Sequence, residues 1–305
     1  APSPQGNETQ LLRGGEMTYE FVELTSQAAT AHWGWTIAFF LWFVGLAGMS
    51  LFLNWWLRSK RVFYVATAAA IIGTLLVVSH LARMLNLPMA AINALIEWKF
   101  NFGSWMFIGI CILAVLCVLT LIQSWGMWKN ARWADSCGLL MIDAILGVAA
   151  TAYSGFLLTQ AAGVPLWTTA VLPVLWIFSG LACAVGLAEI LASTGKLETG
   201  HPHWLAGAAN GVHIGEAFVI FAFVQVALAG TPGAVAGAQS LLSGDNAALF
   251  LGGAVGVGIL VPFLIGLFMK SSKGMVALGG VCALCGALAL RAAVLFAGYF
   301  DPVIF

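Results

Sequence analysis

The sequence predicts an all-α, polytopic membrane protein with eight transmembrane helices. Eight separate stretches are each apolar for about twenty residues, the length that a helix needs to span a hydrocarbon core of ~30 Å. The composition agrees, because 61% of the residues are hydrophobic and 8% are charged, whereas about a quarter are charged in soluble domains. The apolar runs are continuous and lack the alternation of a membrane β-barrel. Both a soluble enzyme and a barrel are therefore excluded.

The first four predicted helices are separated by charged or polar residues. The first follows a polar arm and ends before Arg58, the second begins after Arg61, the third precedes Lys129, and the fourth begins at Asp135. These spans cover residues 33–57, 63–85, 103–125 and 135–160.

The last four predicted helices are delimited in the same way. The fifth begins at Pro165, the sixth after Pro202, the seventh after Asp245 and the eighth after Lys273. These spans cover residues 165–192, 204–230, 247–269 and 275–298.

Two motifs of small residues indicate an internal repeat. Gly45-Leu-Ala-Gly48 and Gly180-Leu-Ala-Cys183 each follow a Leu-Trp pair, and small residues let helices approach closely. The first and fifth spans run in the same direction. The likeness therefore indicates a parallel repeat of two four-helix bundles, and not the inverted repeat of many secondary transporters. We expect an N-terminal arm over residues 1–31 and a membrane domain over 32–305, with halves 32–160 and 161–305.

The distribution of lysine and arginine predicts the orientation in the membrane. Successive connections alternate sides, and the first, third, fifth and seventh hold Arg58, Lys60, Arg61, Lys129, Arg132, Lys196, Lys270 and Lys273. The opposite side holds Arg13, Arg83 and Lys99. Cytoplasmic loops are enriched in positive residues, so we expect both termini to be extracytoplasmic. The outer elements able to receive a partner are residues 1–31, 87–101, 161–165 and the Gly/Ser-rich loop 231–245.

Metal and haem sites are disfavoured by the ligand inventory. The six cysteines fall in or beside spans and are interpreted as small core residues. Cys282-Ala-Leu-Cys285 lacks the loop that iron–sulfur and zinc sites use. Only His80 and His213 lie within spans, at different depths, which argues against a bis-histidine haem. No basic cluster is large enough to indicate nucleic acid.

Ionisable residues inside the spans are the first candidates for chemistry, because charge is costly in the membrane. Counted from the cytoplasmic ends, Asp143 lies about 12 Å deep, His213 and Glu216 about 14–18 Å deep, and Arg291 and His80 about 25–27 Å deep. His213 and Glu216 share a helical face. Together with Asp143 they are candidates for a proton path. The alternative is that these polar groups only hold helices together by hydrogen bonds.

Short motifs occur in a consistent order along almost the whole sequence. They are Trp35-Thr-Ile-Ala38 with Gly45-Leu-Ala-Gly48, His80-Leu-Ala-Arg83, Ser104-Trp-Met106 with Gly109, Tyr153-Ser-Gly155-Phe-Leu-Leu158, Pro165-Leu-Trp167, Leu172-Pro173, Ser179-Gly180, Gly215-Glu216, and Arg291 with Gly298. In this order and spacing the sequence resembles the NrfD/PsrC family, the quinone-reactive membrane subunits of polysulfide, thiosulfate and nitrite reductase-type complexes.

The resemblance implies a membrane anchor without haem or iron–sulfur cluster of its own. Such a subunit binds quinol, either menaquinol or ubiquinol, near the outer face. It exchanges electrons with a peripheral four-cluster ferredoxin-like iron–sulfur subunit, which serves a molybdopterin or multihaem catalytic subunit. The expected location is the prokaryotic inner membrane, with the partners on the periplasmic side.

The resemblance also assigns roles to residues. Tyr153 is the expected hydrogen-bond partner of the quinone ring, His80 the proton acceptor and Arg291 the group that stabilises negative charge. These three are the candidate catalytic residues.

One departure from the family pattern affects the quinone headgroup. Some members place Asn and His on the first span, where this protein has Ile37 and Phe40. The expected headgroup contacts are therefore His32, Asn101 or Ser104.

Two other classes of function remain open from the sequence. A proton-coupled transporter would also use buried acids and proline-broken helices. A purely structural anchor would need the buried charges only for helix packing.

Overall fold

A computed structural model describes residues 30–31, 33–79, 92–93, 96–98, 102–200, 202–269 and 272–301. Within these residues the eight predicted membrane spans are confirmed as helices of sufficient length and hydropathy. They are α1 (Trp35–Leu57), α2 (Lys60–Ser79), α4 (Trp105–Trp128), α5 (Cys137–Thr159), α6 (Val171–Ser193), α7 (Leu205–Leu228), the pair η3 (Ala248–Leu260) and α9 (Val261–Phe268), and α10 (Lys273–Phe296).

The fifth span is shorter than predicted. Residues 165–170 form turns, in which the Trp167 amide donates to the Val164 carbonyl over 3.0 Å, and α6 begins at Val171. The predicted span was too long because the residues of this turn are as apolar as those of a helix. Trp167 in the turn is fully buried, and its indole Nε1 donates to the Val294 carbonyl of α10 over 2.9 Å. An apolar residue in a buried turn thus resembles one in a helix.

The predicted loop over residues 231–245 contains a helix, which corrects the sequence interpretation. α8 (Pro232–Leu242) begins after Thr231 with a proline in its first turn, a position that proline favours. Its buried face consists largely of glycine and alanine, including Gly233, Ala234 and Gly237. These residues signal a helix only weakly in a hydropathy profile, which explains why the sequence indicates a loop here.

The seventh span is wound as a π-helix over Ala248–Leu260 before it continues as α9. π-helices of this length are rare. Gly258 on this helix faces Gly286 of α10, and a Cβ on Gly258 would lie 3.1 Å from the Gly286 carbonyl carbon. The hydropathy of the span does not reveal this winding.

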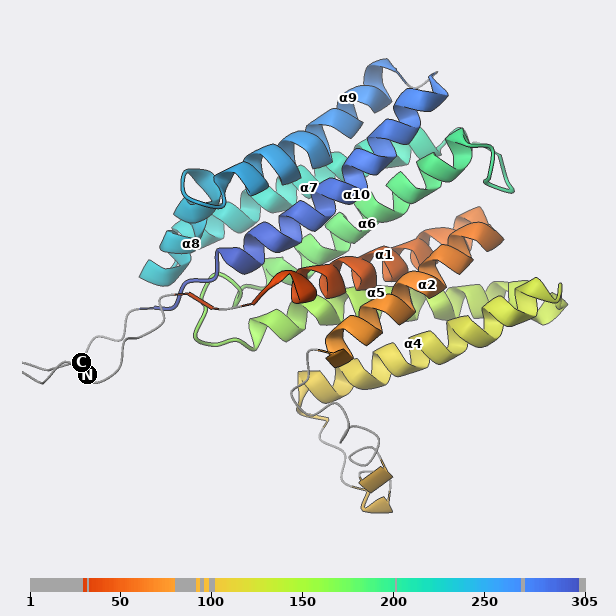
Figure 1. Cartoon of the computed structure of the whole chain (residues 1–305), viewed down its shortest axis with the longest axis horizontal. Helices are drawn as coiled ribbons and strands as arrows, with labels where there is room; N and C mark the ends of the chain where they lie inside the picture. The colour runs from red at the N-terminus through yellow and green to blue at the C-terminus, as the bar shows by residue number, and fades with distance from the viewer. Residues whose placement is uncertain are drawn as a thin grey trace, which may run out of the picture.

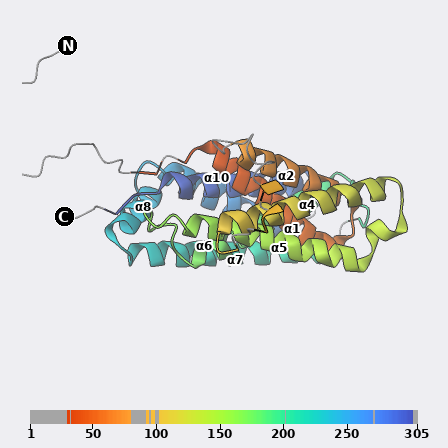
Figure 2. The ribbon, with the colours of Figure 1, turned by 90° about the horizontal axis from the view of Figure 1, so that it is seen from below.

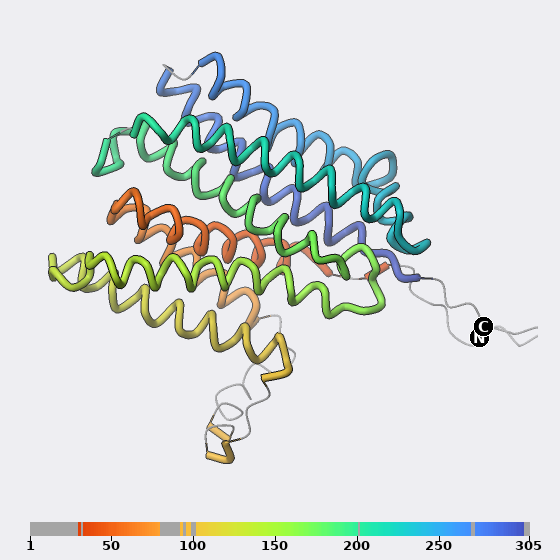
Figure 3. The backbone as a smooth tube through the Cα atoms, turned by 180° about the vertical axis from the view of Figure 1, so that it is seen from behind, coloured from red at the N-terminus to blue at the C-terminus, as the bar shows by residue number. Residues whose placement is uncertain are grey.

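The helices run along one common direction in all three views (Figures 1, 2 and 3). α1 packs against α2 and α5, and α4 contacts both α2 and α5. α6 packs against α7 and α10, and α10 contacts η3 and α9. α1 and α5 both contact α6, so that α1, α5 and α6 join the first four spans to the last four.

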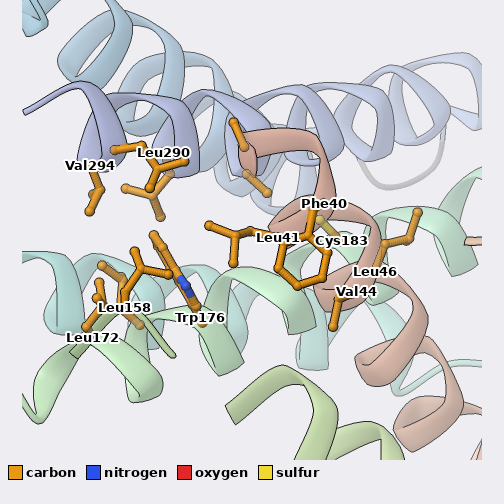
Figure 4. Packing of buried hydrophobic residues seen from close by; sticks show 14 of the residues in the cluster. Phe40, Leu41, Val44, Leu46, Leu158, Leu172, Trp176, Cys183, Leu290 and Val294 are labelled. Atoms are coloured by element: carbon orange, nitrogen blue, oxygen red, sulfur yellow. The ribbon is translucent and has the colours of Figure 1, made fainter. Parts of the chain in front are cut away.

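The core lies where α1, α6 and α10 meet. Figure 4 shows Leu41 of α1 pointing toward Trp176 of α6 and Leu290 of α10, and all three are buried. The small-residue motif permits this packing, since a Cβ on Gly180 would lie 3.0 Å from the Gly45 carbonyl oxygen. The motif therefore marks a helix crossing, as small residues do in membrane proteins.

The segments before α1 and after α10 meet at one end of the molecule. Thr30 and Tyr299 form an antiparallel bridge, and the Ala31 amide donates to the Gly298 carbonyl over 2.9 Å. At the opposite end, the connections with most of the described basic residues are tied together. Ser59 Oγ donates to Glu198 Oε2, and Lys60 Nζ donates to Asn130 Oδ1 over 2.7 Å.

Candidate functional site

The Tyr153 side chain is buried between α4 and α5. A Cβ on Gly109 of α4 would overlap ring carbons and the hydroxyl oxygen of Tyr153, so only glycine leaves room for the phenol in this position. Tyr153 itself is 4% exposed. Among the residues that the structure describes, none forms a hydrogen bond with its hydroxyl group. The phenol is thus buried against Gly109, and its hydroxyl group has no hydrogen-bond partner among the described residues.

An aromatic stack lies one helical turn further along the same pair of helices. Trp105 of α4 stacks on Phe156 of α5 with ring centroids 4.7 Å apart and an interplanar angle of 14°. Ser104 precedes Trp105, and its Oγ accepts a hydrogen bond from the Phe107 amide over 3.4 Å, which caps α4. The structure therefore brings Tyr153 and Ser104 to the same end of the α4–α5 pair.

Three predicted quinone contacts, His80, His32 and Asn101, lie outside the described residues. Ile37 and Phe40, which mark the departure from the family pattern, are both buried in the core.

Arg291 lies at the junction of α1, α6 and α10 and is fully buried. Its Nη1 donates to Ser179 Oγ over 2.7 Å and to the Ala287 carbonyl over 3.1 Å. Its Nη2 donates to the Trp176 carbonyl over 3.4 Å, and the guanidinium carbon lies 5.2 Å from the centroid of the Trp176 ring. A Cβ on Gly45 would overlap Nη2. Glycine at this position of α1 thus leaves room for the guanidinium where it lies.

The charge of Arg291 is not neutralised by a contact ion pair within the described part of the protein. All its hydrogen-bond acceptors are neutral oxygens. Glu216 of α7 is the carboxylate that acts on it over a longer range. The guanidinium is thus held in a buried position by neutral hydrogen-bond acceptors. Arg291 thus lies at the junction of α1, α6 and α10, whereas Tyr153 packs against α4.

His213 and Glu216 lie together on one face of α7. His213 Nδ1 is 3.9 Å from Glu216 Oε2, and both side chains are buried. Both ring nitrogens of His213 lack a hydrogen-bond partner among the described residues. Asn210, three residues earlier, has a buried and unpaired Oδ1 against Gly266 of α9. Asn210 was missed in the sequence interpretation, although the spacing 210, 213, 216 places all three on one face.

Asp143 lies in a different part of the helix arrangement. It is fully buried on α5, and neither carboxyl oxygen has a hydrogen-bond partner among the described residues. Gln123 of α4 is a polar neighbour of this carboxyl group, and its Nε2 donates to the Ala134 carbonyl over 3.0 Å. Gln123 was also missed, because an amide within a span does not stand out as a charge does. α5 packs against α1, α4 and α6, whereas α7 packs against α6, α8, α9 and η3. Asp143 and the His213–Glu216 pair thus lie on helices that have α6 as their common packing neighbour.

The described residues contain no cluster of three or more His, Cys, Asp or Glu side chains that could hold a metal ion. Cys183 is buried, while Cys285, one turn beyond Cys282, is exposed. Tyr153, Arg291 and the acids Asp143 and Glu216 are the predicted site residues that the structure shows to be buried.

Other motif residues contact one another across helices. A Cβ on Gly155 of α5 would lie 2.9 Å from the Pro173 nitrogen of α6, and a Cβ on Gly298 would lie 3.0 Å from Cε2 of Trp167. In these two pairs, a glycine of one motif leaves room for a proline or tryptophan of another.

The protein is similar to known proteins over most of its length. The family described as "Polysulphide reductase, NrfD" matches residues 23–302. A subunit of polysulfide reductase from Wolinella succinogenes is 28% identical, with 89% of the present sequence and 96% of that protein covered. The protein NrfD of Escherichia coli is 26% identical, with 87% and 94% covered. The NrfD homolog of Haemophilus influenzae is 23% identical, also with 87% and 94% covered.

Proposed function

Because the protein belongs to the polysulphide reductase NrfD family, we propose that it is the quinol-binding membrane subunit of a respiratory oxidoreductase complex. In this proposal it has no redox cofactor of its own and binds menaquinol or ubiquinol as substrate. It passes electrons to a peripheral iron–sulfur subunit of the four-cluster ferredoxin-like type. That subunit serves a molybdopterin or multihaem catalytic subunit on the periplasmic side of a prokaryotic inner membrane.

The proposed architecture has two four-helix bundles and both termini on the periplasmic side. Support for the bundles comes from the contacts of α4, which packs on α2 and α5, and of α10, which packs on α6, η3 and α9. Support for the orientation comes from the basic connections tied together at one end, since cytoplasmic loops are enriched in Lys and Arg. The bridge between Thr30 and Tyr299 lies at the other end.

The observation that carries the proposal is the Tyr153 hydroxyl, placed above Gly109 with its hydrogen-bonding capacity unused by described residues. Buried polar groups normally have a hydrogen-bond partner, so a ligand oxygen is the natural partner for this one. The neighbouring stack of Trp105 on Phe156 supplies flat apolar surface suited to a quinone ring. Ser104 supplies a second hydroxyl at the same end of the helix pair.

Quinol oxidation releases two electrons and two protons. In the proposed mechanism the quinol hydroxyl hydrogen-bonds to Tyr153, and His80 accepts the first proton as negative charge develops on the ring oxygen. Histidine suits this role because its unperturbed pKa of about 6.5 is close to the working pH. His32 and Asn101 complete the proposed headgroup contacts.

Arg291 is proposed to stabilise that negative charge through the field of its guanidinium. Its hydrogen-bond acceptors are neutral, so its positive potential is available to a nearby anion. In the fold Arg291 contacts Ser179 and Trp176, and its effect on the quinol is therefore expected to act over a distance.

Proton transfer through the membrane is proposed to use the buried acids. Glu216, His213 and Asn210 form one polar row on α7, and Asp143 with Gln123 forms a second site between α4 and α5. A path that includes all of them has to cross α6. Such a path would let the complex conserve energy, whereas release of both protons on the outer side would make the reaction electroneutral.

The test is quinone binding to the purified protein, measured by fluorescence quenching with a menaquinol analogue. Tyr153→Phe and His80→Ala should each weaken binding at least about fivefold, since a lost hydrogen bond costs about 1 kcal/mol or more. Tyr64→Phe is the matched control, because it removes a phenol hydroxyl near the basic end of α2. Equal binding by all variants would overturn the site, and no binding by a folded protein would favour a transporter or a structural anchor.

A further inference from the structure

Two apolar grooves flank the basic end of α1. The first, of about 320 Å³, lies between Phe52, Trp55 and Trp56 of α1 and the face of α5 from Met141 to Val148. The second, of about 440 Å³, lies between Phe52 and Trp56 and the helices α6 and α7, with Val185 and Trp204 in its wall. We call them the α1–α5 groove and the α1–α7 groove. The lining surface of both is almost entirely hydrocarbon.

Phe52 and Trp56 form a ridge that separates the two grooves. They are one turn apart on α1, with ring centroids 5.0 Å apart at an interplanar angle of 70°. Both residues line both grooves. The α5 wall from Met141 to Val148 extends over seven residues, or about 10 Å, which is a third of a ~30 Å hydrocarbon core. Each groove therefore has the form of a slot for one hydrocarbon tail that enters from the basic end.

The connections above the grooves carry a surplus of positive charge. Arg58 follows Trp56 by two residues, is exposed, and has a left-handed backbone (φ 47°) at the end of α1. Arg61 Nη1 donates to the Lys196 carbonyl over 2.6 Å, which joins the connection after α1 to the one that leads to α7. Glu198 accepts from Ser59 and pairs with Arg61 at 3.8 Å. The charges of Arg58 and Lys196 thus remain without an ion pair within the described part of the protein.

We propose that this surface is a binding site for one anionic glycerophospholipid from the membrane leaflet at the basic end. One acyl tail lies in the α1–α5 groove and the other in the α1–α7 groove, so that they straddle the Phe52–Trp56 ridge. The phosphate lies near Arg58 and Lys196, and the Trp56 and Trp204 rings lie at the level of the headgroup, as aromatic residues do at membrane interfaces. The proposal does not depend on quinol binding.

The shape and chemistry of the grooves favour a lipid over other occupants. A partner helix is about 10 Å wide and would need one open trough, whereas the ridge divides this surface into two slots. A quinone headgroup needs hydrogen-bonding groups, and the lining of the grooves offers almost none. The positive charges of Arg58 and Lys196 favour an anionic lipid over a neutral one. Each basic residue near the membrane surface raises the affinity for an anionic lipid about fivefold.

The test uses the full-length protein, delipidated in detergent, and measures binding of phosphatidylglycerol and phosphatidylcholine by native mass spectrometry. The wild-type protein should hold one phosphatidylglycerol per molecule and prefer it to phosphatidylcholine. Ala144→Phe with Ala208→Phe fills both grooves and should abolish binding of both lipids. Arg58→Gln with Lys196→Gln should leave the grooves intact and reduce the preference for phosphatidylglycerol by about 25-fold.

Lys129→Gln is the matched control, because it removes one cation from a different connection at the same end. It should leave the preference nearly unchanged. Equal loss of preference in this control and in the Arg58/Lys196 variant would overturn the proposal, since the lipid would then respond only to net charge. Unchanged binding after both grooves are filled would also overturn it. A dimer of the protein that the groove-filling variant dissociates would assign the surface to a second copy instead. Quinol binding measured on the same variants should stay intact, which separates this site from the Tyr153 site.

Discussion

Replacing Gly109 by alanine tests whether α4 positions the Tyr153 phenol. A methyl group at this position would overlap the phenol ring and its hydroxyl oxygen, so the ring has to leave its place or the helices have to separate. In a helix interior, alanine is more favourable than glycine by about 1 kcal/mol of folding free energy. Overpacking in a well-packed core costs about 1–3 kcal/mol. The net expectation is a loss of stability of up to about 2 kcal/mol, together with displacement of the hydroxyl group.

Gly211→Ala on α7 is the matched control, since nothing lies within 4 Å of a Cβ at that position. The free energy of unfolding of the Gly211→Ala variant should rise by about 1 kcal/mol. The free energies of unfolding of the Gly211→Ala and Gly109→Ala variants should therefore differ by about 1–3 kcal/mol, the cost of overpacking. The assay is chemical unfolding in detergent micelles, with binding of a menaquinol analogue measured in parallel. In a Tyr153→Ala background the Gly109→Ala substitution should no longer cost stability, because the ring that it overlaps is absent.

The reasoning would be refuted if Gly109→Ala matched Gly211→Ala in unfolding and bound the analogue like the wild type. An equal cost of Gly109→Ala with and without the Tyr153 ring would also refute it, because two side chains in contact have to couple in a double-mutant cycle.

Three further predictions concern the buried polar groups. Ser179→Ala should lower the free energy of unfolding by about 1.5–3 kcal/mol, because it removes a hydrogen bond to the Arg291 cation. The comparison is Ser240→Ala on α8, where a buried serine accepts a hydrogen bond from the neutral Asn246 amide; equal unfolding curves for the two variants would contradict the prediction. Glu216→Gln should reduce quinol-driven proton transfer in the assembled complex and leave binding of the menaquinol analogue intact, because the amide keeps the shape of the side chain and loses its charge. The measurement is the number of protons transferred per electron, and an unchanged ratio would exclude Glu216 from the path. Asp143→Asn should slow quinone-dependent turnover at least about tenfold if protons cross the membrane here, and full turnover with unchanged proton stoichiometry would argue against a transmembrane route.

The spans could be predicted because they depend on local hydropathy. A helix inside the membrane needs about twenty apolar residues wherever its neighbours lie, and Trp105–Trp128 and Cys137–Thr159 agree with the predicted spans within three residues. The prediction was wrong in two places. Residues 232–242 form α8 where a loop was predicted, and α6 begins at Val171 where the predicted span began at residue 165. In these segments packing against neighbouring helices decides the conformation, and hydropathy carries little information about it.

The sequence singles out candidate residues by their charge, but it does not show which of them lie near one another in the fold. Charge within an apolar span singled out Asp143, Glu216 and Arg291. Their depth gave no information about lateral position, so the sequence could not show that α5, with Asp143, and α7, with Glu216, have only α6 as a common packing neighbour. Gln123 and Asn210 were missed because uncharged amides do not stand out in an apolar run.

By itself, the sequence determined that the protein forms eight membrane helices, which of them carry charge, and which family the motifs resemble. Only the tertiary structure decided which helices meet, and therefore that Gly109 makes room for Tyr153 and Gly45 for Arg291. The reason is physical. Hydropathy measures the transfer of each residue from water to the membrane, one residue at a time, whereas contact between helices depends on the fit of two surfaces that lie far apart in the sequence.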